Sequence, residues 1–168
     1  MHGIVIRDAR IPDEVATARS MFEEYAAWLN VDLCFQDFAG ELARLPGDYA
    51  APRGCLLFAA IGPDIAGCAA LRPLASHPDS VGEVKRLYVR PSARGTGAGR
   101  RLAEAVIERA RAIGYAELKL DTLATMDAAR ALYRSLGFRE CAAYYVNPVP
   151  GVMYMSLPLR SSVTPGSA

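Results

Sequence analysis

The chain has 168 residues, a formal net charge of +1 at pH 7 and a hydrophobic fraction of 52%. This length suits one folded domain with a substantial core. We expect that domain to span residues 1–160, with a polar, disordered tail at 161–168. Because the charge is close to zero, nothing in the composition favours nucleic acid or an anionic membrane as a partner.

The cysteines and histidines argue against a metal centre. The 4 cysteines contain no C-x-x-C pair, and neither of the 2 histidines adjoins a cysteine cluster, so we expect no metal site. Free thiols are typical of a reducing cytosol. The sequence has neither an apolar leader nor the roughly 20-residue apolar run of a membrane span. We therefore expect a cytoplasmic protein that does not enter a membrane.

The first part of the chain predicts one strand and two helices. Residues 3–7 alternate as in a strand. Pro-Asp-Glu at 12–14 is typical of a helix start, because proline suits the first turn and acids suit the positive end of the helix dipole. The apolar spacing then predicts a helix up to Leu29 and a second helix over 35–45, where a Pro-Gly pair stops it.

The middle of the chain predicts three strands and a helix. Apolar runs at 55–60 and 65–71 flank a Gly-Pro-Asp turn and are typical of a β-hairpin. Residues 72–82 are rich in turn formers and predict a loop. A fourth strand at 83–89 and an amphipathic helix at 99–113 follow.

The last part of the chain completes a mixed α/β pattern. It predicts a strand at 117–121, a helix at 127–136 that ends at a glycine, and two strands at 144–146 and 152–157. The order predicts a mixed α/β domain in which a meander comes first and helix crossovers come later.

A glycine-rich turn connects the fourth strand to the helix after it. Residues 94–99 read Arg-Gly-Thr-Gly-Ala-Gly, and Arg100 and Arg101 come next. Glycine lets a ligand approach the backbone closely, and a helix start offers unpaired amides and a partial positive charge. This pattern predicts a phosphate or pyrophosphate site, to which arginines add charge-assisted hydrogen bonds. The alternative is a connection with only a packing role.

Two common nucleotide-binding motifs do not fit this turn. A P-loop has a lysine after its glycines, and none follows here. A dinucleotide-binding fold has a third small residue where this chain has Leu102, and its glycines usually lie on the first βα turn rather than late in the chain. We therefore expect another carrier of a pyrophosphate.

At these residues the chain resembles the GCN5-related N-acetyltransferase (GNAT) superfamily. The resemblance covers most of the chain and is strongest over residues 83–138. Two signatures carry it. The acetyl-CoA signature [Q/R]-x-x-G-x-[G/A] is met by Arg94, Gly97 and Gly99, and A-x-x-L-Y-x-x-x-G-F is met by Ala129, Leu132, Tyr133, Gly137 and Phe138.

The resemblance implies a fold and an activity. The fold is a central mixed, mostly antiparallel, twisted sheet of about seven strands, flanked by about four helices and splayed at strands 4 and 5. The activity is acetyl-CoA-dependent transfer of an acetyl group to a primary amine of a small molecule or peptide. It proceeds by direct attack in a ternary complex, with no metal. Homodimers are frequent in such proteins. The alternative from another class is a non-catalytic acyl-CoA sensor.

The resemblance also implies site residues. Glu83 would be the base that takes a proton from the amine, and Tyr133 would protonate the leaving thiolate. The backbone of Leu87, Tyr88 and Val89 would pair with the pantetheine arm. The pyrophosphate would be held at Arg94, Gly95, Thr96, Gly97, Ala98, Gly99 and Arg100.

Each of these roles has a structural alternative. Glu83 would otherwise be a surface carboxylate at a strand end, with Asp121 as an alternative base. Tyr133 would otherwise only pack in the core. The family often has a coenzyme A-contacting asparagine where this chain has Met126, so that role is not carried over. The adjacent Asp127 is expected to cap its helix instead.

The last hairpin lies over the active site in this superfamily, so Tyr144, Tyr145 and Asn147 are candidates for the acceptor pocket. The alternative is that the two tyrosines are ordinary strand residues, one buried and one exposed. We expect Trp28 to pack in the core or at a helix interface.

Overall fold

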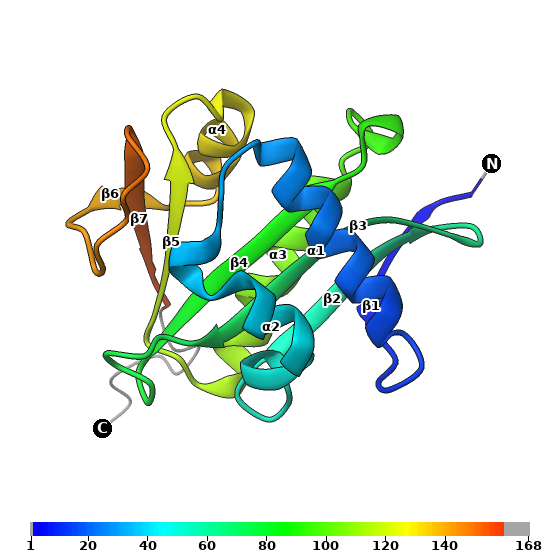
Figure 1. The fold of residues 1–168 in the computed structure, drawn as a ribbon, viewed down its shortest axis with the longest axis horizontal. Helices are drawn as coiled ribbons and strands as arrows, with labels where there is room; N and C mark the ends of the chain where they lie inside the picture. Colours follow the sequence, from blue (N-terminus) through cyan, green and yellow to red (C-terminus); the bar gives the residue numbers. More distant parts are fainter. Residues whose placement is uncertain (1, 160–168) are drawn as a thin grey trace, which may run out of the picture.

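The computed structural model describes residues 2–159. Seven strands form one sheet in the order β1-β2-β3-β4-β5-β7-β6 (Figure 1). The strands are β1 (Ile4–Asp8), β2 (Cys55–Ile61), β3 (Asp64–Pro73), β4 (Val81–Val89), β5 (Glu117–Leu123), β6 (Arg139–Cys141) and β7 (Val152–Pro158). The mixed sheet expected from the sequence is therefore present.

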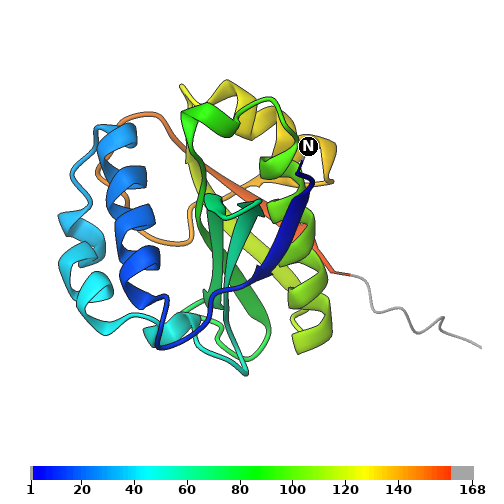
Figure 2. The same cartoon turned by 90° about the vertical axis from the view of Figure 1, so that its right-hand side faces the viewer.

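Helices cover both faces of this sheet (Figure 2). One face carries α1 (Val15–Leu29) and α2 (Phe38–Arg44), and the other carries α3 (Ala98–Ile113) and α4 (Asp127–Ser135). Each face of the sheet buries its own apolar cluster, because successive side chains of the central strands point to opposite faces. Among the helices of residues 2–159, none combines the length and the hydropathy needed to cross a membrane.

The strand pairing creates an opening near the middle of the sheet. Strands β1 to β4 form an antiparallel meander, and α3 then returns the chain so that β5 runs parallel to β4. Their pairing joins Val81 to Glu117, Gly82 to Leu118 and Glu83 to Lys119, and stops there. Both strands continue beyond this point, so they diverge and leave one edge of β4 without its neighbour. The splay implied by the resemblance is confirmed.

A β-bulge lies within the diverging part of β4. Lys85 pairs with Ala70 and Tyr88 pairs with Cys68, so Arg86 and Leu87 share one position of β3. Arg86 has φ of 59°, a backbone conformation that is uncommon outside glycine. The extra residue shifts the alternation of side chains between the two faces. As a result, Lys85 and Arg86 both lie towards the α1 and α2 side.

Two predicted elements differ from the structure. The helix expected over 35–45 is divided into a 3₁₀ turn at Cys34–Gln36 and α2 by Asp37, whose φ is 53°. The strand expected at 144–146 is wrong, because this segment is irregular and β7 pairs instead with β6 at Arg139–Cys141. The spacing of apolar residues does not reveal such breaks, since periodicity reports which side chains are buried rather than whether the helix is continuous.

Two expected helix starts also differ. Helix α1 begins at Val15, so the Pro-Asp-Glu run at 12–14 lies before its first turn and not in it, and Glu14 pairs with Arg7 and Arg10. Asp127 is the first residue of α4 rather than its cap, and it pairs with Arg130. The tail expected at 161–168 lies outside the described residues.

Candidate active site

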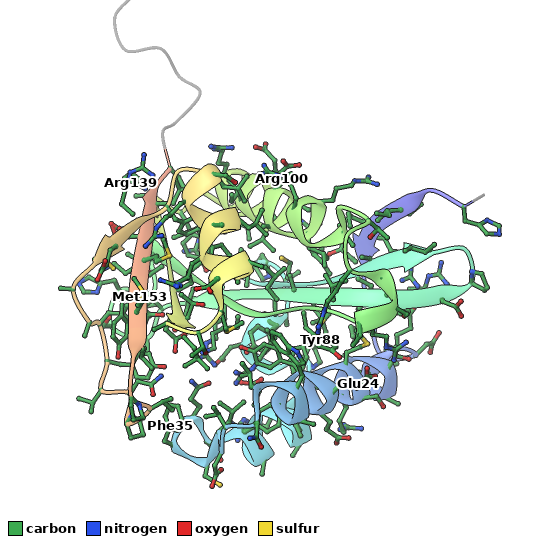
Figure 3. All side chains as sticks on the ribbon, turned by 90° about the horizontal axis from the view of Figure 1, so that it is seen from above. Glu24, Phe35, Tyr88, Arg100, Arg139 and Met153 are labelled. Atoms are coloured by element: carbon green, nitrogen blue, oxygen red, sulfur yellow. The ribbon has the colours of Figure 1, made fainter. Side chains whose placement is uncertain are left out.

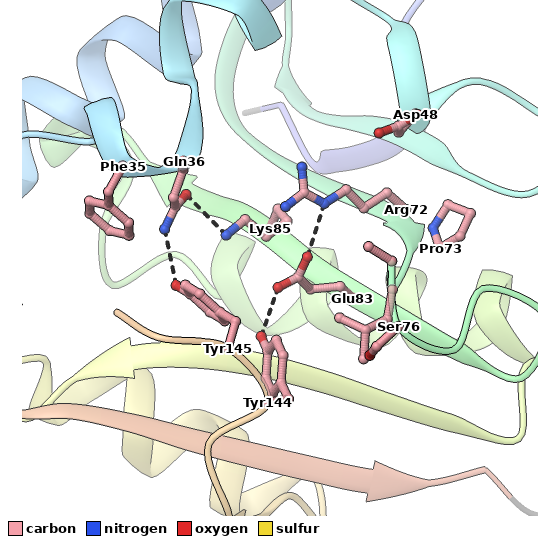
Figure 4. A pocket seen from close by; sticks show the side chains of 12 residues that line it. Phe35, Gln36, Asp48, Arg72, Pro73, Ser76, Glu83, Lys85, Tyr144 and Tyr145 are labelled. Carbon is pink, nitrogen blue, oxygen red and sulfur yellow. Dashed lines mark hydrogen bonds and ion pairs between the residues drawn. The ribbon is translucent and has the colours of Figure 1, made fainter. Parts of the chain in front are cut away.

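A cavity of about 350 Å³ opens on the α1 and α2 side of the sheet. Its floor is formed by Glu83 and Lys85 of β4, which are two residues apart and therefore share a face. The turn at Cys34–Gln36, the end of β3 and the irregular segment after β6 form its walls (Figure 4). We call this space the acceptor cavity.

Glu83 is held inside the acceptor cavity by two partners. The antiparallel register places Arg72 of β3 opposite it, and Arg72 Nε donates to Glu83 Oε1 at 2.9 Å. The Tyr144 hydroxyl donates to Glu83 Oε2 at 2.8 Å (Figure 4). The side chain is only 4% exposed, so the alternative of a surface carboxylate at a strand end is wrong.

Asp121 of β5 forms a second polar centre on the other side of the splay. Tyr145 and Asn147 donate hydrogen bonds to it, and Lys85 Nζ lies 3.6 Å away. Burial raises the pKa of Asp121, but the Lys85 ammonium and the two hydrogen bonds more than offset this and hold that pKa below its usual value. Burial lowers the pKa of Lys85, and nearby carboxylates offset this only in part.

Tyr144 and Tyr145 belong to a segment that crosses the splay instead of extending the sheet. Their rings pack on each other and on Tyr154, with centroids 5.3 to 5.7 Å apart. Both side chains are half-buried, and their hydroxyls bind carboxylates on two different strands. The alternative of one buried and one exposed strand tyrosine is therefore wrong.

A narrow space of about 30 Å³ lies within the splay itself. Residues 84–87 of β4 line one side, and the other lining residues are Tyr25, Asp121, Thr122, Met126 and Tyr133. Tyr133 is buried, with its ring at 5.5 Å from that of Phe138. Burial raises the pKa of the Tyr133 hydroxyl, so this group stays protonated across the ordinary pH range. Lys85 lines both this space and the acceptor cavity.

The glycine-rich turn leads directly into α3. Gly97 precedes the helix with φ of 89°, and the Thr96 hydroxyl accepts a hydrogen bond of 3.4 Å from the first amide of α3, at Ala98. A methyl group added at Gly95 or Gly97 would meet nothing within 4 Å, so the backbone there faces open space. The amides of Gly99 and Arg100, in the first turn of α3, come before the first intrahelical bond, which runs from Arg101 to Gly97. Arg100 is turned away from it and donates to the Ser135 hydroxyl at 2.6 Å.

Trp28 lies beside this turn and not in the core, so the expectation of core packing is wrong. It is 43% exposed, its ring centroid is 5.9 Å from that of Tyr88, and Arg94 Cζ lies 4.8 Å from it. It borders an outer groove of about 430 Å³ with Met126 and the start of α4. Figure 3 shows Tyr88 between the sheet and α1.

Comparison with known proteins identifies the family. The model of the acetyltransferase (GNAT) family matches residues 17–138. An uncharacterized N-acetyltransferase of Schizosaccharomyces pombe is 36% identical over 156 residues, covering 92% of this chain and 94% of that protein. The chain therefore belongs to the GNAT family of acetyltransferases.

Solved structures show the same fold. An acetyltransferase of Streptococcus agalactiae has a TM-score of 0.75 at 20% identity and covers 95% of this chain and 100% of its own. A protein of Salmonella typhimurium, solved with its cofactor acetyl-CoA, has a TM-score of 0.73 at 21% identity and covers 99% of both chains.

Sequence reasoning misses three features of the polar site. Arg72 falls in a predicted loop, although β3 extends to Pro73 and places it opposite Glu83. Gln36 falls in a predicted helix, but it binds Lys85, Arg86 and Tyr145. The part played by Lys85 is also missed. The one usable signal is the run Glu-x-Lys-Arg from residue 83, since such charges are rare in a central strand.

Proposed function

We propose that this protein transfers an acetyl group from acetyl-CoA to a primary amine by direct attack in a ternary complex. The observation that supports this most is the position of two proton-handling groups at one opening in the sheet. Glu83 lies in the acceptor cavity, and Tyr133 lies in the narrow space within the splay. The two spaces share Lys85 as a lining residue.

Each part of the site would have its own role in the reaction. The edge of β4 beyond Glu83, which β5 does not pair, would offer backbone groups to the pantetheine arm, at Leu87, Tyr88 and Val89, and to the thioester oxygen. The carbonyl of Val89 also accepts a hydrogen bond from Arg94 Nε at 3.1 Å. The amides after Gly97 would hold the pyrophosphate. Glu83 would accept a proton from the acceptor ammonium, because only the neutral amine can attack the thioester. As the C–N bond forms and the C–S bond breaks, the Tyr133 hydroxyl would protonate the departing sulfur. The second proton lost by the attacking nitrogen would then restore the Tyr133 hydroxyl.

The size of the acceptor cavity favours a small molecule over a protein segment as the acceptor. About 350 Å³ is at the low end of the range for small-ligand sites. The decisive experiment is an amine screen with acetyl-CoA, read by liberated thiol. Turnover supports an enzyme. Tight binding of acetyl-CoA with no thiol release from any amine or peptide supports the non-catalytic sensor instead.

Gly97→Ala is expected to weaken acetyl-CoA binding by about tenfold or more, because alanine disfavours the positive φ that aims the first amides of α3. The same helix supplies a matched control in Gly114, which has φ of 105° and where an added methyl group would also meet nothing within 4 Å. Both variants should lose roughly 1–2 kcal/mol of stability. Calorimetry with acetyl-CoA should separate them, and equal affinities would remove the turn from the binding site.

Trp28→Ala is expected to raise the Kd for acetyl-CoA by about tenfold, since the ring borders the outer groove together with Met126. Trp28→Phe should recover most of the affinity, because an aromatic wall remains. Isothermal titration of both variants measures this. If Trp28→Ala binds acetyl-CoA with normal affinity, the coenzyme does not contact the outer groove at Trp28.

A further inference from the structure

We propose that the acceptor carries a carboxylate next to its reactive amine, as an α-amino acid does. This inference rests on the proposed function and concerns the substrate class of the same site. It follows from the charges that surround Glu83 in the acceptor cavity. A bare alkylammonium that reaches Glu83 also meets the guanidinium of Arg72, which already pairs with Glu83. A zwitterion instead places its ammonium against Glu83 and its carboxylate against Arg72.

Arg72 is the first of these cations. Its Nε donates to Glu83 Oε1 at 2.9 Å, so the guanidinium and the proposed base are in direct contact. Its Nη1 is 3.8 Å from Glu41 Oε1, longer than a hydrogen bond. Within the described residues, the hydrogen bonds of the guanidinium are confined to Nε, and the side chain is 25% exposed. Arg72 lines the cavity, and its Nη1 and Nη2 donors therefore remain available for the oxygens of a carboxylate.

Lys85 is the second cation. Its Nζ donates to Gln36 Oε1 at 3.2 Å and lies 3.6 Å from Asp121 Oδ1, and Figure 4 shows it beside Arg72 along the same wall. An ammonium bound at Glu83 would thus lie close to the Arg72 guanidinium, a like charge that disfavours its binding, while Lys85, which Asp121 partly neutralises, lines the same cavity. A carboxylate on the acceptor removes that repulsion by facing Arg72 and Lys85.

The contact between Arg72 and Glu83 also limits where the acceptor's two charges can be. Because the guanidinium and the carboxylate touch, only an acceptor whose ammonium and carboxylate are separated by one or two carbons can meet both. Asp48 also lines the cavity, and the apolar part of its wall is formed by Phe35, Pro73, Leu74 and Ala75. These residues leave room for an uncharged side chain on the acceptor.

The test is a set of matched acceptors that differ only at the carboxylate. For each of the common amino acids, thiol release from acetyl-CoA is measured with the free acid, its primary amide and its decarboxylated amine. The best free acid is expected to exceed its amide and its amine in kcat/KM by about 10- to 100-fold, the effect of one charged hydrogen-bonded pair.

Arg72→Gln supplies the second arm of the test. Its absolute rate is expected to fall, because Arg72 also contacts Glu83, so the informative quantity is the ratio of free acid to amide. That ratio should approach one in Arg72→Gln. The control is Arg109→Gln, in which the ratio should remain high, because Arg109 pairs with Asp8 and does not line the cavity.

The outcomes separate this inference from the proposed function. Turnover of amides or simple amines that equals or exceeds that of the acids would overturn the carboxylate requirement while leaving the acetyltransferase intact. An acid preference that persists in Arg72→Gln would overturn the assignment to Arg72. No thiol release from any amine, including peptides, would overturn the proposed function itself.

Discussion

Glu83→Gln is expected to lower kcat/KM for the acceptor by about 10²- to 10⁴-fold, the usual contribution of a positioned general base. The amide cannot accept the ammonium proton at neutral pH. Its oxygen can still accept the hydrogen bond from Arg72 Nε, which lies 2.9 Å from the native carboxylate. Because the side chain keeps its shape, the Kd for acetyl-CoA should change by no more than about threefold.

Asp121→Asn is the matched control for Glu83→Gln. Asp121 is also shielded from solvent, also binds a tyrosine hydroxyl and also borders the splay. It pairs with Lys85, whereas Glu83 faces the acceptor cavity. A clearly smaller loss in Asp121→Asn would support Glu83 as the base. If Asp121→Asn shows the larger loss and Glu83→Gln turns over normally, the base is Asp121.

The central strand, turn and helix were predictable because local chemistry determines them. Residues 94–99 need glycine for the positive φ at Gly95 and Gly97. The apolar residues of α3 recur at helical spacing, so the sequence alone shows which face of this helix is buried. The splay of β4 from β5 came from the family resemblance. In the structure, the pairing of β4 with β5 stops at Glu83, and the β-bulge at Arg86 lies in the part of β4 that has separated from β5.

The acceptor cavity was harder to predict because contacts between distant segments build it. Arg72 reaches Glu83 only through the β3–β4 register. Tyr144 and Tyr145 have high strand propensity, yet their hydroxyls bind carboxylates on β4 and β5, and these bonds draw the segment across the splay. Tertiary hydrogen bonds to buried carboxylates outweigh local preference here, and a single sequence contains no signal for them.

Tyr133→Phe is expected to lower kcat by about 10- to 100-fold with little change in stability, because phenylalanine keeps the edge-to-face contact with Phe138. Burial keeps the native hydroxyl protonated, so wild type and variant should differ by a constant factor across neutral and mildly alkaline pH. Single-turnover measurements are needed, since product release limits many enzymes.

Tyr25 provides the sharpest comparison for Tyr133. It lines the same narrow space, and burial raises its pKa to about 12, so it too is a protonated hydroxyl near the expected sulfur position. If Tyr133 is the proton donor, Tyr25→Phe should retain most of the single-turnover rate. A larger loss of rate in Tyr25→Phe than in Tyr133→Phe would identify Tyr25 of α1 as the proton donor. Equal and small defects in both would mean that the thiolate departs without a tyrosine donor, and that Tyr133 serves the packing of α4 against the sheet.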